Sequence, residues 1–177
     1  NYYDLVYNRE VTKIEKIQEL LKKEESLVEY FVGENDIFIF IITKNTHKIV
    51  KVAKDFPLKN WIEQLRNGIY NYWSMSNASS DEDLKKYNQL YKDMAFKLYQ
   101  KLVQPIESEI THKVIIIPDG ELHFIPFDAL LTADSKEISA TKNLPYLIKK
   151  YQISYNYSAT LYNQLKQKET SNSTNDV

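Results

Sequence analysis

The chain has 177 residues, the length of one domain or of one domain with a small appendage, and its formal net charge of −1 does not suit a nucleic-acid surface. With 43% hydrophobic and 27% charged residues, it has the composition of an ordinary globular protein. No apolar run approaches the roughly 20 residues of a membrane span. There is no cysteine, which excludes a thiolate nucleophile and a thiolate metal site within these residues.

The basic residues are almost all lysines. Arg9 and Arg66 are the only arginines, so the donors for bidentate phosphate or base contacts are nearly missing. The three glycines form neither a dinucleotide-binding fingerprint nor a P-loop, and no cofactor or metal is expected. The N-terminus lacks the pattern of a signal peptide, and we expect it to start inside a longer, cytoplasmic protein.

Residues 11–23 are predicted to form an amphipathic helix, because apolar residues recur at every third or fourth position. Three strand patterns follow at 27–32, 37–43 and 48–52, and polar connectors of hairpin length separate them. They predict an antiparallel meander. The middle run is apolar on both faces, so we expect it to be a central, doubly covered strand. His47 is interpreted as a turn residue.

Two long helices are predicted next. From Pro57 to Trp73, apolar residues recur at spacings of three and four, which favours core packing over a platform for stacked bases. After a polar linker, Ser80 and three following carboxylates predict a capped N-terminus, and this second helix ends before Pro105. Because the linker is short, we expect an antiparallel pair.

The segment 113–131 reads KVIIIPDGELHFIPFDALL, and the chain is organised around it. The β-branched run 114–117 has no alternation, which suits a parallel strand buried on both faces. Pro118, Asp119 and Gly120 predict an abrupt turn, since proline fixes φ, aspartate bonds to nearby backbone and glycine accepts a positive φ.

The remaining residues predict the start of a βαβ series. Pro126 suits the first position of a short helix, a second strand is expected at 151–156, and Ser158 is expected to cap a last helix. The polar segment 169–177 is interpreted as a disordered tail or linker. Two strands alone make no stable parallel sheet, so we expect the sheet to continue beyond Val177.

Two stretches, IIIPDGELHFIPFDALL and YLIKKYQISYNYSATLYNQL, resemble the front part of the CHAT family, caspase-like domains often found behind tetratricopeptide repeats. The matching elements are Pro118-Asp119-Gly120, Leu122-His123, Pro126-Phe127, Ala129-Leu130, Tyr146-Leu147-Ile148 and Ser158-Ala159-Thr160. Ile125 stands where the family usually has leucine. The meander also looks like the one that precedes the family's core, so the resemblance covers most of residues 25–165.

The resemblance implies an α/β fold: a partial caspase-like sheet with flanking helices, preceded by the small antiparallel meander and the helix pair. Residues 1–24 would be a helical lead-in. Residues 25–168 would be the N-terminal portion of a CHAT domain, with the meander at 27–53, the helix pair at 57–103 and the first core strands at 113–168. The tail would be 169–177.

The family implies cysteine peptidase chemistry, in which a thiolate attacks a peptide carbonyl and an imidazole manages the protons. Both dyad residues are expected on later strands, so this cysteine-free chain is expected to be inactive alone and to supply one wall of the substrate cleft. A protein or peptide substrate, and possibly tetratricopeptide repeats in the same protein, are the implied partners. The alternative is a non-catalytic CHAT-like regulatory or interaction module.

Asp119 is the candidate for a substrate pocket that prefers a basic side chain, because ligands of open α/β sheets bind beyond the carboxyl ends of the strands. The alternative is an Asx turn that only holds the loop. His123 is expected to pack in the corner between strand and loop, with one nitrogen bonded to backbone, and His112 to be exposed. Structural roles are also expected for the remaining conspicuous residues of these motifs, Pro118, Gly120, Pro126, Phe127 and Ser158.

Overall fold

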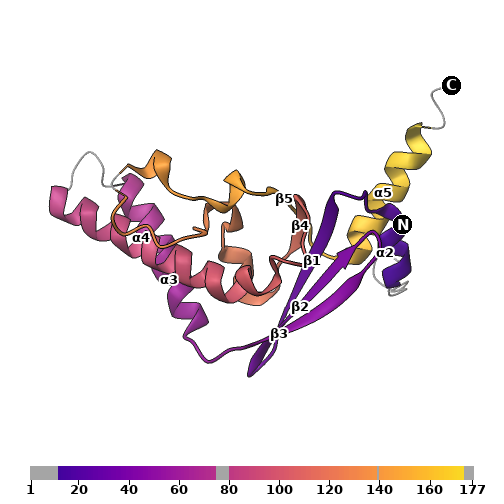
Figure 1. Ribbon diagram of the computed structural model, residues 1–177, viewed down its shortest axis with the longest axis horizontal. Coiled ribbons are helices and arrows are strands. Elements are labelled where there is room, and N and C mark those ends of the chain that lie inside the picture. The colour runs from indigo at the N-terminus through magenta and orange to yellow at the C-terminus, as the bar shows by residue number, and fades with distance from the viewer. Residues whose placement is uncertain (1–11, 75–79, 139, 174–177) are drawn as a thin grey trace.

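The computed structural model describes residues 12–74, 80–138 and 140–173 (Figure 1). Within these ranges the strands are β1 (Glu25–Val32), β2 (Asp36–Thr43), β3 (His47–Ala53), β4 (Lys113–Ile117) and β5 (Gln152–Tyr155). The helices are α2 (Ile14–Leu20), α3 (Leu58–Ser74), α4 (Asp81–Leu102) and α5 (Ala159–Ser173). Short 3-10 helices include η2 (Gly120–Phe124) and η3 (Phe127–Ala129).

The described strands form one mixed sheet in the order β3-β2-β1-β4-β5. β1, β2 and β3 are antiparallel neighbours, which confirms the predicted meander. β4 is parallel to both β1 and β5, and Leu27 of β1 lies opposite Ile115 of β4. β2 lies inside the sheet between β3 and β1, as expected for the middle strand of the meander. Its coverage differs from the prediction, because buried and half-buried residues alternate along most of β2. β1 is the middle strand of the whole sheet, because its other edge pairs with β4.

The sheet lies between two groups of helices, α3 and α4 on one side and α2 and α5 on the other (Figure 1). The larger core lies on the α3/α4 side, where alternate residues such as Val28, Ile39 and Ile116 are buried. The Tyr30 hydroxyl, buried there, donates to the Leu102 carbonyl over 2.9 Å. The single polar atom of this ring is therefore satisfied inside the core.

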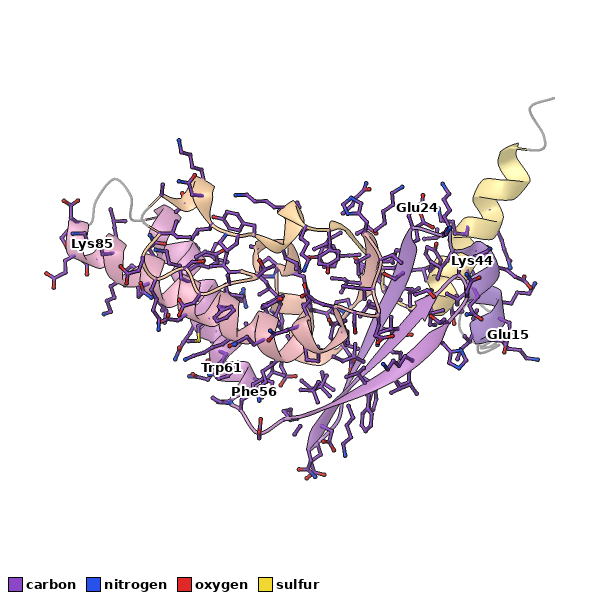
Figure 2. The ribbon with its side chains drawn as sticks, viewed as in Figure 1. Glu15, Glu24, Lys44, Phe56, Trp61 and Lys85 are labelled. Atoms are coloured by element: carbon purple, nitrogen blue, oxygen red, sulfur yellow. The ribbon has the colours of Figure 1, made fainter. Side chains whose placement is uncertain are left out.

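The α3–α4 pair is antiparallel, as predicted. Phe56, just before α3, and Trp61, in its first turn, stack with ring centroids 4.9 Å apart and lie beside each other in Figure 2. Lys101 lies over the first ring and Lys97 over the second, so advancing along α3 means moving back along α4. The predicted N-cap of α4 is confirmed, because Ser80 Oγ accepts from the Asp83 amide over 3.2 Å.

On the opposite face, α2 and α5 cover a smaller cluster that includes Ile17, Leu27, Ile115 and Tyr162. α2 is shorter than the helix predicted over 11–23, of which residue 11 lies outside the described residues. It ends at Leu20 because Leu21 is already extended (ψ 137°) and buries its side chain against the sheet.

Residues 169–173, which we expected to belong to a tail or linker, continue α5 to Ser173. Neither proline nor glycine occurs between Ala159 and Ser173, so no residue interrupts the helix there. Residues 174–177 lie outside the described part. None of the described helices combines the length and the apolar character needed to cross a membrane.

Candidate functional site

The three parallel strands end at one edge of the sheet. β1 ends at Val32, β4 at Ile117 and β5 at Tyr155. Because parallel strands share their direction, the segments that follow them meet at this edge, which is where open α/β sheets bind ligands. The turn after β4 and the N-terminus of α5 are both placed there.

The turn after β4 depends on its local sequence. Pro118 is buried, and Gly120 has φ +53°, a left-handed conformation that side chains with a Cβ rarely adopt. The Leu122 amide then donates to the Asp119 carbonyl over 3.0 Å and opens η2. Leu122 is fully buried, so the turn is anchored to the core two residues after the glycine.

Asp119 bonds across strands. Its Oδ2 accepts from the Val32 amide over 2.8 Å, and its side chain makes no cap bond to η2. β4 pairs with β1 only as far as Glu29, so the Val32 amide lies beyond the last backbone pair between them. The Asp119 carboxylate replaces the missing strand as acceptor and ties the turn after β4 to the end of β1.

Glu29 is a second carboxylate at this edge. It lies on β1 opposite Ile117 and is half-buried. Its pKa is raised above the ordinary value of a glutamate, first because burial disfavours the charged form and also because Asp119 adds a like charge. The backbone amide of Ala159, at the start of α5, partly offsets this rise. The carboxyl edge therefore concentrates negative charge.

Sequence reasoning missed Glu29. The available signal was a single carboxylate inside the apolar run LVEYFV, but a strand with one solvated face carries such residues without any function. Its neighbour Asp119 lies 90 positions later in the chain, and no local pattern predicts that the two meet.

His123 is exposed, whereas we expected it to pack in the corner between strand and loop. The buried position of η2 is taken by Leu122, which turns the next side chain outward. His123 Nδ1 lies 3.1 Å from the Gly120 carbonyl oxygen. A carbonyl only accepts, so Nδ1 carries a proton and, in the neutral ring, Nε2 is left as an acceptor.

On the α3 side of the turn lies a cleft of about 1000 Å³. One wall is α3, and the other is the segment 123–128 together with Tyr155. The Tyr155 hydroxyl donates to Asp128 Oδ2 over 2.5 Å. Burial and then the Asp128 carboxylate raise the pKa of this phenol, so it remains a donor. Asp119 does not line this cleft.

The other expected site residues are distributed as follows. Phe127 is fully buried, with its ring centroid 5.4 Å from that of Tyr30, and Pro126 precedes it as the N-cap of η3. Ser158 Oγ accepts from the Leu161 amide over 3.0 Å. His112 is exposed, with Nδ1 3.2 Å from the Lys150 carbonyl oxygen. In the described ranges, no three His, Asp or Glu side chains group as metal ligands would.

Comparison with known proteins identifies one family. The sequence model of the CHAT domain matches residues 92–176, from the middle of α4 through β4, the turn and β5. The meander and α3 lie outside the matched range, although we expected the resemblance to begin near residue 25. No curated protein matches the chain.

Proposed function

We propose, from the match of residues 92–176 to the CHAT domain model, that the chain forms one wall of the substrate cleft of a caspase-like cysteine peptidase. The His–Cys dyad would be supplied by strands that follow in the same protein, since these residues contain no cysteine. The substrate would be a protein or peptide. Tetratricopeptide repeats in the same protein are a further proposed partner.

The observation that carries this proposal is the position of Asp119 and Glu29 at the carboxyl edge of β1, β4 and β5. Ligands of parallel sheets bind at this edge. A lysine or arginine side chain of the substrate would find two carboxylates there, one of which bears the cost of burial without a cationic partner. We therefore propose that Asp119, supported by Glu29, selects a basic residue next to the scissile bond.

The test uses the protein encoded by the complete gene and separates charge from architecture. Asp119→Asn keeps an oxygen acceptor for the Val32 amide and removes the negative charge. We expect kcat/KM for a fluorogenic peptide with arginine at the cleavage site to fall by at least about tenfold, as for the loss of one charge-assisted contact. Asp134→Asn, an exposed aspartate in the loop after η3, is the matched control.

An Asp119→Asn enzyme that still cleaves the arginine peptide at the wild-type rate would overturn the proposed preference. A complete protein without peptidase activity and without a histidine and a cysteine on later strands would favour the alternative, a non-catalytic CHAT-like interaction module. Replacing the expected cysteine by alanine gives the decisive background measurement for either outcome.

A further inference from the structure

The cleft beside α3 is separate from the carboxyl pair, because neither Glu29 nor Asp119 lines it. Its polar groups come from different elements. Glu63 and Arg66 belong to α3, Asp128 to η3, and Tyr155 is the last residue of β5. The cleft is therefore distinct from the proposed peptidase pocket.

Arg66 is the one arginine of the described residues, in a chain whose other cations there are lysines. Its guanidinium lies over the Phe124 ring, with Cζ 5.0 Å from the centroid. Within the described ranges, the cation of each ion pair is a lysine, so no carboxylate there pairs with the Arg66 guanidinium. A guanidinium that lies over a ring leaves its N–H donors available for a planar acceptor such as a carboxylate.

The charges around Arg66 limit which kind of ligand can supply this acceptor. Two carboxylates, Glu63 and Asp128, line the same cleft. A phosphate or another polyanion would meet both of them, with one guanidinium as compensation. A single carboxylate on an otherwise neutral chain meets less repulsion than a polyanion, and the N–H groups of that chain can pair with the acidic walls.

The apolar part of the cleft suits an extended chain. Tyr70 is 70% exposed and Phe124 57% exposed, which are large values for aromatic rings at a cleft rim. Ile69 and Pro126 also line it. Exposed apolar surface gathered around a few polar groups is typical of a protein-interaction site. At about 1000 Å³, the cleft holds several residues of a peptide.

We propose that this cleft binds an extended segment of a partner protein through one acidic side chain, whose carboxylate pairs with the Arg66 guanidinium. Apolar side chains of the segment pack on Tyr70 and Phe124, and its backbone N–H groups donate to Glu63 and Asp128. The exposed rims let both ends of the segment leave the cleft, so an internal aspartate or glutamate fits better than a chain terminus.

The test is fluorescence anisotropy with the protein encoded by the complete gene. The probes are fluorescein-labelled octapeptides with amidated C-termini, each with one central glutamate flanked by leucine and phenylalanine, and the same peptides with glutamine. We expect the glutamate peptides to bind at least about tenfold more tightly, the difference of one charge-assisted pair. This comparison changes only the peptide, so it does not depend on a variant folding.

Three protein variants locate the site. Arg66→Gln should remove the preference for glutamate, and Arg66→Lys should reduce it, since lysine lacks the planar fork. Glu63→Gln should increase the preference for glutamate over glutamine peptides, because it removes a like charge from the cleft and keeps an oxygen acceptor for the segment's N–H groups. Lys59→Gln, which removes an exposed cation on α3 away from the cleft lining, should leave the affinity unchanged.

Three outcomes would overturn the proposal. The first is equal affinity for glutamate and glutamine peptides, and the second is absence of binding by any peptide of the set up to about 1 mM, a limit of weak association. The third uses an added control, the glutamine peptide with a free C-terminal carboxylate. Binding of this peptide alone would assign Arg66 to chain termini instead of acidic side chains.

Discussion

The Asp119 carboxylate accepts a hydrogen bond from the Val32 amide over 2.8 Å, and this bond joins the turn after β4 to the last residue of β1. Asp119 therefore has two roles at the carboxyl edge of the parallel strands. It satisfies a backbone donor that no strand reaches, and it places a negative charge beside Glu29.

Asp119→Ala should lower the free energy of unfolding by about 1–3 kcal/mol, because the Val32 amide loses its acceptor while partly buried. Asp119→Asn should cost clearly less, since an amide oxygen still accepts. Urea denaturation followed by circular dichroism measures both. Glu34→Ala, an exposed carboxylate in the β1–β2 turn, should have almost no effect. Equal losses for Asp119→Ala and Asp119→Asn would show that the hydrogen bond is not what Asp119 contributes.

Glu29 should weaken the fold as the pH rises. Its pKa is higher in the folded chain than in the unfolded chain, chiefly because of burial, so the folded state binds the proton more tightly. This contribution to stability is present below the unfolded pKa and is lost as the pH rises through the folded pKa. Glu29→Gln, which cannot ionise, should therefore lose less stability than the wild type between acidic and neutral pH.

Glu24 offers a control of opposite sign for the same titration. Hydrogen bonds from its own backbone amide and from Lys113 hold the pKa of this exposed carboxyl below its usual value. Its stabilisation is present above the unfolded pKa and is lost on acidification, so Glu24→Gln should be the less stable variant at neutral pH. The measurement is the urea midpoint of the wild type, Glu29→Gln and Glu24→Gln across the acidic to neutral pH range. Parallel curves for Glu29→Gln and the wild type would contradict a raised pKa.

The elements that sequence predicts well are those with local causes. The hairpin connectors predict the meander, and the caps at Ser80 and Ser158 lie within three residues of the amides they bind. The non-alternating run 114–117 predicts a buried strand, and β4 is that strand. Each of these features depends on residues that are neighbours in the chain.

The features that sequence did not predict depend on distant partners. β1 and β4 are separated by the whole helix pair, and a parallel pairing leaves no mark comparable to a hairpin turn. This pairing puts β1 at the centre of the sheet and brings Glu29 to Asp119. In the same way, no local pattern predicts that Arg66 lies over the Phe124 ring, because this contact forms only where the turn after β4 packs against α3.

Gly68 should not tolerate a methyl group. A Cβ at this position would lie 2.8 Å from the Tyr91 amide nitrogen and 2.9 Å from its Cα, both backbone atoms of α4. Gly68→Ala should therefore destabilise the fold by about 1–3 kcal/mol, as overpacking does, although glycine-to-alanine exchange in an open helix stabilises. Thermal unfolding gives the sign. Lys59→Ala, on the exposed face of α3, is the control, and a stabilised Gly68→Ala would mean that the two helices are further apart.

Glu107 should control the ionisation of Tyr99. It accepts from Lys150 Nζ over 2.9 Å and from the Tyr151 hydroxyl over 3.3 Å, at the amino end of the parallel strands. Burial, followed by a hydrogen bond to Glu107 and its charge, raises the pKa of Tyr99 to about 12. Glu107→Gln removes the charge that opposes phenolate formation, so the pKa of Tyr99 should fall.

Stopped-flow pH jumps that outrun alkaline unfolding, read by tyrosinate absorbance, measure this change when Tyr99→Phe supplies the background signal. The matched control is Glu109→Gln. Glu109 pairs with Lys48 over 2.8 Å and is not among the groups that shift Tyr99. If the pH midpoint of Tyr99 ionisation moves equally in both variants, the change in its pKa comes from overall charge. A shift confined to Glu107→Gln would trace it to the direct contact between the carboxylate and the phenol.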